Sequence, residues 1–298
     1  MIKSVAVIGG GTMGNGIAHV FAQKGYSVNL IDVRQDALDR ALSTIVKNMD
    51  RQIAKGGLTE EEKTASLGNI TTFTQLAQGV ANVDLVVEAA TENVDIKLSI
   101  FRDMDAHAPA HAILASNTSS ISITKIAAVT KRPDKVVGMH FMNPVPVMKL
   151  VEVIEGFKTS QEVTETILEL SKNLGKVPAL TKDYPGFIAN RILMPMINEA
   201  IISLHEGVAG VEEIDTIMKL GMAHPMGPLQ LADFIGLDVC LAILNVLHDG
   251  FGNPKYAPSP LLVNMVTSGD LGVKSGRGFY DYSHGTKDLV VAPGFAKK

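Results

Sequence analysis

Short apolar runs alternate with longer amphipathic segments over residues 1–183. Apolar runs bounded by glycine or polar residues are typical of buried β-strands. They lie at residues 5–8, 28–31, 70–73, 84–88, 113–115, 135–140, 150–154 and 176–180. Segments 36–55 and 93–107 repeat apolar residues every three or four positions, which predicts helices. Strands that alternate with helices predict an α/β fold with a doubly wound, mostly parallel sheet.

The pattern changes after residue 183, where helical periodicity continues and strand-like runs almost disappear. Helices are predicted near residues 188–206, 212–220, 229–235, 238–248 and 260–267. The first of these is apolar on nearly every side, so we expect it to be buried within a helical domain or at a subunit interface. The sequence therefore predicts a sheet domain over residues 1–183 and an all-helical C-terminal domain over residues 184–298.

The first predicted strand leads directly into a glycine-rich turn. Gly9, Gly11 and Gly14 form G-x-G-x-x-G, which allows a tight turn, close approach of a pyrophosphate and close packing of the next helix. The second strand ends on Asp32, at the right distance to bond both ribose hydroxyls of NAD. Glycines alone are weak evidence, but strand, glycines, helix, strand and Asp occur in the required order. The sequence predicts a Rossmann-like domain that contacts NAD through Gly9, Gly11, Thr12, Met13, Gly14 and Asp32.

Composition narrows the class of protein. Hydrophobic residues make up 46% and charged residues 19% of the 298 residues, as in a soluble globular protein with a large core. The formal net charge of −4 argues against nucleic acid as a main partner. The single cysteine, Cys240, excludes an internal disulfide, and no residues are assigned to a metal. We expect a cytoplasmic protein without a membrane partner, because the first strand leaves no room for a signal peptide before it.

Ligands of a doubly wound sheet bind beyond the carboxyl ends of its strands. His140 ends one predicted strand, and histidine is the usual proton acceptor when an alcohol is oxidised. Glu152 lies within an otherwise apolar strand, where a carboxylate needs a partner. Taken singly, His140 could be a loop histidine with ordinary hydrogen-bond partners, and Glu152 could be a glutamate at a strand edge. Together in a dinucleotide-binding domain, they indicate a general base and the carboxylate that orients it.

Hydroxyl and amide side chains near these strand ends have two interpretations. Ser119 could polarise a substrate oxygen, whereas capping of the next helix is the more ordinary role for Ser120 or Ser122. Asn190 lies just inside the nearly apolar helix, where a buried amide needs hydrogen-bond partners. A substrate carbonyl is one candidate partner, so both interpretations stay open for Ser119 and Asn190.

Six stretches form a more specific signal than the glycine pattern. They are VIGGGTMG at 7–14, VVEA at 86–89, ASNTSS at 115–120, HFMNPVPVM at 140–148, DYPGFIANR at 183–191 and HPMGPL at 224–229. With these motifs the chain resembles the L-3-hydroxyacyl-CoA dehydrogenase family, in particular its stand-alone bacterial 3-hydroxybutyryl-CoA dehydrogenases. The similarity runs from residue 5 to about residue 280, which is nearly the whole chain.

The resemblance implies an oxidoreductase that interconverts an (S)-3-hydroxyacyl-CoA and the 3-ketoacyl-CoA with NAD(H). His140 is similar to the general base of the family and Glu152 to its orienting carboxylate. Ser119 and Asn190 match residues that bind the reacting oxygen and the thioester. Further matches are Glu92, Lys97, Ser119, Asn143 and Lys274 at the cofactor, and Asn48, Lys55 and Ser119 at CoA. The resemblance also implies butyrate or fatty-acid metabolism and a homodimer formed by the later helices.

The helix predicted over residues 36–55 has a basic side that fits this CoA assignment. Arg40, Lys47, Arg51 and Lys55 lie opposite the apolar side, with Asn48 beside Lys55. Such a side is usually just solvated. Acidic residues avoid it after Asp36, however, so we expect four cations in line for the phosphates of CoA.

Two alternatives from other classes remain. One is a related NAD-dependent dehydrogenase that acts on a sugar acid and binds no CoA. The other is a non-catalytic, crystallin-like protein that kept the fold. The second alternative predicts the loss of His140 or Glu152, and both are present. Binding of CoA would distinguish a 3-hydroxyacyl-CoA dehydrogenase from a dehydrogenase of a sugar acid.

Overall fold

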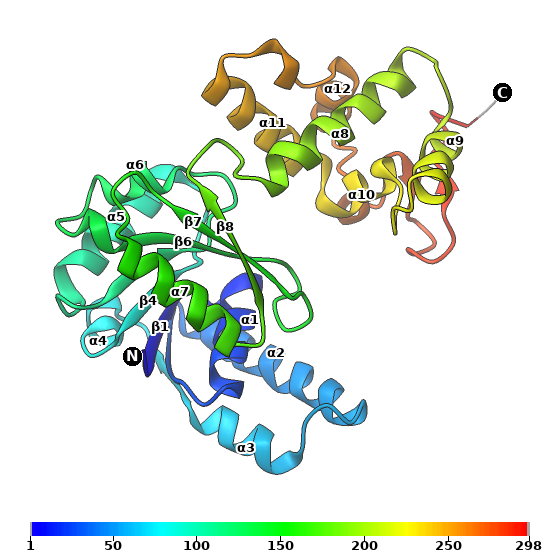
Figure 1. Cartoon of the computed structure of the whole chain (residues 1–298). Coiled ribbons are helices and arrows are strands. Elements are labelled where there is room, and N and C mark those ends of the chain that lie inside the picture. The colour runs from blue at the N-terminus through cyan, green and yellow to red at the C-terminus, as the bar shows by residue number, and fades with distance from the viewer. Residues whose placement is uncertain (1, 297–298) are drawn as a thin grey trace. The chain divides into compact units, whose positions relative to one another are not determined.

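The computed structural model describes residues 2–296 and divides into two compact units, Met1–Tyr184 and Pro185–Lys298 (Figure 1). This boundary lies one residue from the one predicted between Asp183 and Tyr184. The outermost positions of the two predicted domains, 1 and 297–298, lie outside the described residues. Each unit has its own hydrophobic core.

An eight-stranded sheet forms the centre of the first unit, with the strand order β3-β2-β1-β4-β5-β6-β7-β8. The strands are β1 (Ser4–Ile8), β2 (Ser27–Ile31), β3 (Ile70–Phe73), β4 (Leu85–Glu88), β5 (Ile113–Ser116), β6 (Val136–Phe141), β7 (Leu150–Glu155) and β8 (Val177–Lys182). Neighbours run parallel except β6 and β7, which pair antiparallel. The predicted doubly wound, mostly parallel fold is confirmed. Its strand order reverses between β1 and β4, where such sheets bind ligands.

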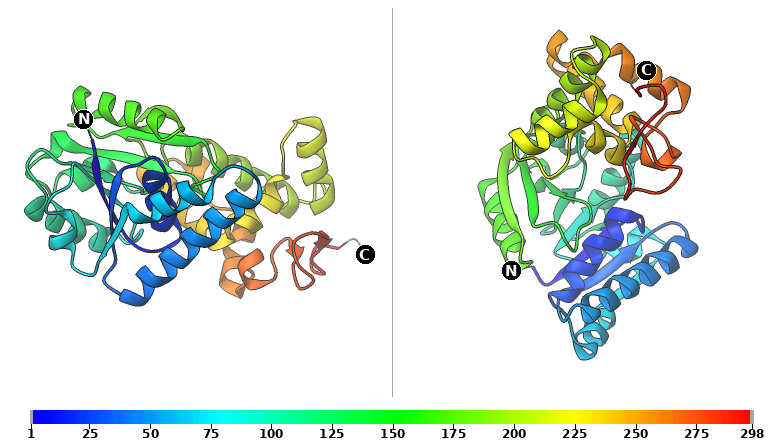
Figure 2. Two further views of the ribbon diagram at one scale, coloured as in Figure 1. Left: turned by 90° about the horizontal axis from the view of Figure 1, so that it is seen from below. Right: turned by 90° about the vertical axis from the view of Figure 1, so that its right-hand side faces the viewer.

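Helices cover both faces of this sheet (Figures 1 and 2). They are α1 (Thr12–Gln23), α2 (Gln35–Ala54), α3 (Glu60–Gly68), α4 (Leu76–Val80), α5 (Val94–His107), α6 (Ile123–Ala127) and α7 (Gln161–Asn173), with a 3-10 turn η1 (Pro133–Lys135). α1, α2 and α7 place their apolar sides in one core with Val5 and Val7 of β1. The alternation of strand side chains leaves the other face to α4, α5 and α6.

Helices make up most of the second unit, as the sequence predicts. They are α8 (Ala189–His205), α9 (Val211–Thr216), α10 (Pro228–Ile235), α11 (Leu237–Phe251) and α12 (Pro260–Ser268), with short turns η2 (Ile217–Gly221), η3 (Pro254–Tyr256) and η4 (Val273–Ser275). Their apolar sides enclose one core, which includes the buried Cys240. Two strands of two residues, β9 (Tyr280–Asp281) and β10 (Val290–Val291), add an antiparallel ribbon that the sequence pattern does not reveal.

The apolar helices of this unit are buried on one side rather than all round. In α8, Met194 and Ile201 are fully buried, whereas Ile192 is 67% exposed. Over residues 2–296, no single helix has both the length and the apolar composition needed to cross a membrane. The pair α10 and α11, bent by 97°, meets these two criteria only when taken together.

Candidate active site

The glycine-rich turn between β1 and α1 has the geometry that a dinucleotide needs. Gly9 has a φ of +106°, and a Cβ atom at Gly14 would lie 1.8 Å from the Gly9 carbonyl oxygen. Neither position accepts a side chain without strain. A Cβ atom at Gly11 would meet no heavy atom of the surrounding described residues within 4 Å, so Gly11 faces open space. This space borders the first turn of α1, which no side chain of the described residues caps and which starts with Thr12 and Met13.

A cavity of about 600 Å³ lies beyond the carboxyl ends of β1 and β2. Asp32 lines it, and its two carboxylate oxygens accept the N–H groups of Gly10 at 2.8 Å and Arg34 at 3.1 Å. These bonds hold the carboxylate against the glycine turn, where the fingerprint assigns ribose recognition. The open face at Gly11, the uncapped helix start and the fixed carboxylate together fit NAD.

His140 and Glu152 lie opposite each other on the antiparallel strands β6 and β7. His140 Nδ1 and Glu152 Oε2 are 2.8 Å apart, and the two residues are 9% and 3% exposed. A carboxylate can only accept, so Nδ1 donates in this bond. The ring nitrogen Nε2 is then the proton acceptor of the neutral imidazole. The two residues that the sequence singles out thus form one hydrogen-bonded pair.

Ser119 lies in the turn after β5 and is bound to Glu92. Glu92 Oε1 accepts the Ser119 N–H at 2.6 Å and the Ser119 hydroxyl at 2.8 Å, and Glu92 Oε2 accepts the Thr118 hydroxyl at 2.9 Å. The turns after β4 and β5 therefore share one polar cluster at the sheet edge. Ser122 caps α6 by accepting the Lys125 N–H at 3.1 Å, which is the role expected of it.

The ammonium group of Lys97 lies beneath this cluster. Its side chain is 2% exposed and forms an ion pair with the fully buried Glu88. Lys97 Nζ also lies 3.4 Å from the Ser116 hydroxyl oxygen and 3.7 Å from Glu92 Oε2. Lys97 therefore supports Glu92 from the protein side, whereas the sequence resemblance assigns it to the cofactor. Sequence reasoning misses Glu88 as its partner, although a glutamate that ends an apolar strand is a usable signal.

Asn143 lies in loop 142–149, which joins β6 to β7. It is exposed, and its peptide bond to Pro144 is cis. Just before this loop, the Phe141 N–H donates to Asn117 Oδ1 at 2.8 Å. This bond connects the end of β6, and hence the neighbourhood of His140, to the turn that contains Ser119.

Two of the predicted site residues belong to the second unit. Asn190 lies in the first turn of α8 and is half-buried. Lys274 lies in η4 and forms an ion pair with Asp238, the two charged atoms Nζ and Oδ2 being 2.5 Å apart. The assignments of Asn190 to the thioester and of Lys274 to the cofactor stay predictions.

Two of the three residues predicted to bind CoA, Asn48 and Lys55, lie in or directly after α2, whereas the third, Ser119, follows β5. Asn48 is half-buried and accepts from Arg51 Nη1 at 3.4 Å, and the exposed Lys55 follows the last helical residue. Arg40, the first cation of the predicted basic row, has an acidic partner. It forms an ion pair with Asp36 at 2.6 Å and lines the cavity beside Asp32. The spacing of four residues brings Asp36 within reach of Arg40, so this first cation of the row is paired with a carboxylate.

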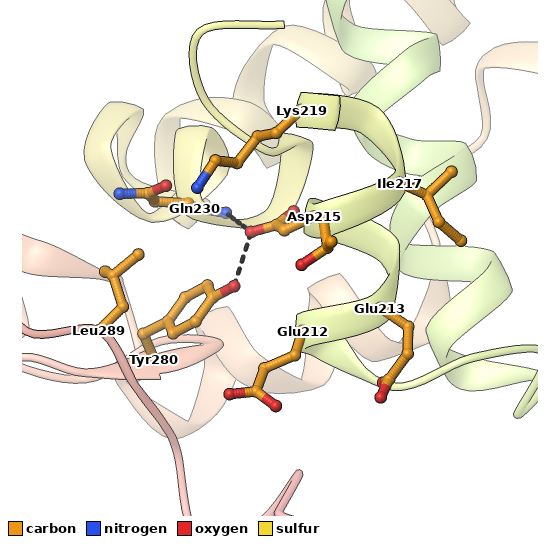
Figure 3. Close-up of a pocket in the computed structure, with 9 residues that line it drawn as sticks. Glu212, Glu213, Asp215, Ile217, Lys219, Gln230, Tyr280 and Leu289 are labelled. Carbon is orange, nitrogen blue, oxygen red and sulfur yellow. Dashed lines mark hydrogen bonds between the residues drawn. The ribbon is translucent and has the colours of Figure 1, made fainter. Parts of the chain in front are cut away.

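A second cavity, of about 470 Å³, lies within the helical unit (Figure 3). Asp215 lines it, and burial raises the pKa of this carboxyl. The carboxylate accepts the N–H groups of Leu229 at 2.8 Å and Gln230 at 2.9 Å. It also accepts the Tyr280 hydroxyl at 2.8 Å. Asp215 therefore caps α10 and joins it to β9, so the fold itself accounts for this buried acid.

The comparisons with known proteins agree with this geometry. Residues 4–184 match the family described as 3-hydroxyacyl-CoA dehydrogenase, NAD binding domain. Residues 186–282 match the family described as 3-hydroxyacyl-CoA dehydrogenase, C-terminal domain. The two matches meet at the boundary between the two compact units.

Known relatives match this chain over nearly their whole length. A 3-hydroxybutyryl-CoA dehydrogenase of Bradyrhizobium diazoefficiens is 54% identical over 282 residues, which cover 95% of this chain and 96% of that protein. The human mitochondrial hydroxyacyl-coenzyme A dehydrogenase is 46% identical over 289 residues, covering 95% of this chain and 92% of that one. The crystal structure of (S)-3-hydroxybutyryl-CoA dehydrogenase from Ralstonia eutropha matches with a TM-score of 0.93 and 50% identity, covering 95% of this chain and 100% of that one. The chain therefore belongs to the 3-hydroxyacyl-CoA dehydrogenase family and is an NAD-dependent oxidoreductase.

Proposed function

We propose that the chain interconverts (S)-3-hydroxybutyryl-CoA and acetoacetyl-CoA by hydride transfer with NAD(H). The hydrogen bond between His140 and Glu152 carries this proposal, because oxidation of an alcohol needs a base that is held in one tautomer. The names of the relatives from Bradyrhizobium and Ralstonia support the hydroxybutyryl group.

The two residues divide the proton chemistry between them. NAD, when bound, supplies the nicotinamide ring that takes the hydride from C3 of the substrate. His140 Nε2 accepts the proton of the 3-hydroxyl group while the C3–O bond becomes a carbonyl. Glu152 stays ionised, orients the ring through Nδ1 and stabilises the imidazolium that forms. In the reductive direction the imidazolium returns the proton to the 3-oxygen.

Ser119 is proposed to bind the reacting oxygen. Its hydroxyl group donates to Glu92, so the Ser119 oxygen can accept a bond from a 3-hydroxyl group. To donate to a 3-keto oxygen instead, the hydroxyl must turn away from Glu92. Asn190 is proposed to bind the thioester carbonyl through its amide N–H groups.

Asn48 and Lys55 are proposed to hold the nucleotide end of CoA. The Lys55 ammonium can bind a phosphate, and the Arg51 contact orients the Asn48 amide. An exposed lysine–phosphate contact contributes only about 1 kcal/mol and weakens with salt. These residues therefore influence the affinity for CoA more than the chemical step.

The helical unit is proposed to form a homodimer. Ile217 is 57% and Leu220 is 81% exposed, which leaves apolar surface at η2. We expect a dimer in sedimentation experiments and a shift toward monomer in Leu220→Asp. A wild-type monomer would contradict this part of the proposal.

The direct test is reduction of acetoacetyl-CoA with NADH, followed by a series of longer 3-ketoacyl thioesters. We expect turnover that is fastest with acetoacetyl-CoA and absent with acetoacetate alone. A dehydrogenase of a sugar acid would instead act on a substrate without CoA and would not reduce the CoA thioesters. The absence of turnover with every thioester would overturn the proposal.

A further inference from the structure

Loop 142–149 connects the strand of His140 to the strand of Glu152. Within it, the Pro144 carbonyl accepts the N–H groups of Val147 at 3.0 Å and Met148 at 2.9 Å. These bonds fold the loop into a turn, but they do not connect it to the rest of the domain. Contacts from other elements must therefore set the position of the loop.

A buried lysine provides one of these contacts. Lys176 lies between α7 and β8 and is 8% exposed. Its Nζ donates to the carbonyl oxygens of Val145 at 2.5 Å and Met148 at 2.7 Å. Beside it, the Val177 N–H donates to the Lys149 carbonyl at 2.8 Å. A side chain and a backbone bond thus connect the loop to the start of β8.

The buried ammonium group of Lys176 needs hydrogen-bond acceptors. Burial lowers the pKa of Lys176, because removing an ammonium group from water is costly unless acceptors replace the water. The two loop carbonyls are such acceptors. The loop position and the buried charge therefore stabilise each other.

Helix α1 makes a second contact with the loop. A Cβ atom at Gly16 of α1 would lie 2.9 Å from Val145 Cβ and 3.1 Å from Val145 Cγ2. Val145 itself is 2% exposed. The loop therefore contacts both Lys176 and α1, the helix that follows the glycine-rich turn.

We propose that Lys176 is a positioning residue for the dehydrogenase reaction: its ammonium group fixes loop 142–149 and, through it, the orientation of His140 and Asn143. This inference rests on the proposed function of His140. Lys176 acts at a distance, because its partners are carbonyl groups of the loop and not the reacting atoms. Small displacements of a catalytic group reduce kcat strongly, whereas substrate affinity changes less.

The test compares Lys176→Met, which removes the donors, with Lys176→Arg, which keeps them. In Lys176→Met we expect amide hydrogen exchange in 142–149 to accelerate about tenfold or more. We expect kcat with acetoacetyl-CoA to fall roughly ten- to hundredfold, with little change in its KM. In Lys176→Arg both effects, the faster exchange and the lower kcat, should be smaller. Lys172→Met, on the exposed side of α7, is the matched control and should behave like wild type.

Gly16→Ala gives a second perturbation of the same loop if Lys176→Met does not fold. Its methyl group pushes on Val145, so faster loop exchange and lower kcat are expected there as well. If amide exchange in loop 142–149 is unchanged in both variants, Lys176 does not fix the loop. If exchange is fast but kcat stays normal, the position of the loop does not affect the reaction. If the proposed function fails instead, wild type lacks turnover while loop exchange still responds to Lys176→Met.

Discussion

The Ser119 hydroxyl and the Ser119 N–H both donate to the same carboxylate oxygen of Glu92, at 2.8 Å and 2.6 Å. The Lys97 ammonium lies 3.7 Å from the other oxygen of this carboxylate. Glu92 thereby joins a buried ion pair to a residue that is proposed to contact substrate. These bonds hold the Ser119 turn, and the effect of removing them can be measured.

Glu92→Ala should lower kcat/KM for acetoacetyl-CoA by about tenfold or more, since a hydrogen bond to a charged acceptor contributes about 1.5–3 kcal/mol. Glu92→Gln keeps an acceptor oxygen and should lie between alanine and wild type. Steady-state kinetics of both variants would show this order. Equal activity of Glu92→Ala and wild type would contradict it.

His140→Gln should reduce kcat by about 10²–10⁴ because it removes the proposed general base. Glu152→Gln should also reduce kcat steeply, since the imidazolium loses its counter-charge. The losses should not add in the double variant, because the pair acts as one unit. NADH affinity, measured by fluorescence titration, should stay near wild type in all three. Near-normal kcat in either single variant would refute the assignment.

The wild-type enzyme should prefer NADH to NADPH in kcat/KM, because Asp32 would meet a 2′-phosphate as a like charge. The ion pairs of Asp36 with Arg34 and Arg40 reinforce this preference by neutralising nearby cations. Asp32→Ala should therefore lower the ratio of kcat/KM for NADH to kcat/KM for NADPH. Comparable kcat/KM values for the wild type would show that Asp32 does not discriminate.

Lys55→Ala should raise KM for acetoacetyl-CoA several-fold, as expected from a loss of about 1 kcal/mol, and leave kcat nearly unchanged. A truncated pantetheine thioester should be reduced equally well by both proteins. Arg40→Ala is an informative contrast, because Arg40 lines the dinucleotide cavity and should affect KM for NADH instead. If Lys55→Ala raised KM equally for the CoA and the pantetheine thioester, Lys55 would not bind the nucleotide end of CoA.

Burial lowers the pKa of His19 from 6.5 to about 4, although the nearby Gln52 and Gln23 side chains favour its charged form. Between these values the unfolded chain binds a proton that the folded chain does not, so stability falls as pH falls through this window. The shift corresponds to at most about 3 kcal/mol. His19→Leu should therefore lose less stability than wild type between pH 7 and pH 4 in urea unfolding. The exposed His107→Gln should keep the wild-type pH dependence, and an identical dependence in His19→Leu would contradict the prediction.

The pairing of His140 with Glu152 was only partly predictable. The sequence places both residues on strands, but the antiparallel direction of β6 and β7 depends on the connection between them. Loop 142–149 is shorter than the roughly twelve residues that a parallel crossover needs. Its length was therefore a usable signal for the hairpin that brings the two residues together.

Other contacts depend on packing that local patterns do not reveal. Lys97 turns inward because α5 packs against the sheet with this side chain toward Glu88. Polar spacing alone cannot distinguish such an orientation from an exposed one. The ion pair between Asp36 and Arg40 differs, because a spacing of four residues on a helix makes it visible in the sequence.

The antiparallel turn between β6 and β7 also has a consequence for folding. His140 and Glu152 are separated by 12 positions along the chain, so closing one short hairpin brings the imidazole and the carboxylate together. Such low contact order makes the entropy of loop closure small for this pair. The glycine turn and Glu88, by contrast, meet only after the chain has crossed the sheet. The proposed proton-transfer pair can therefore form before the glycine turn meets β4.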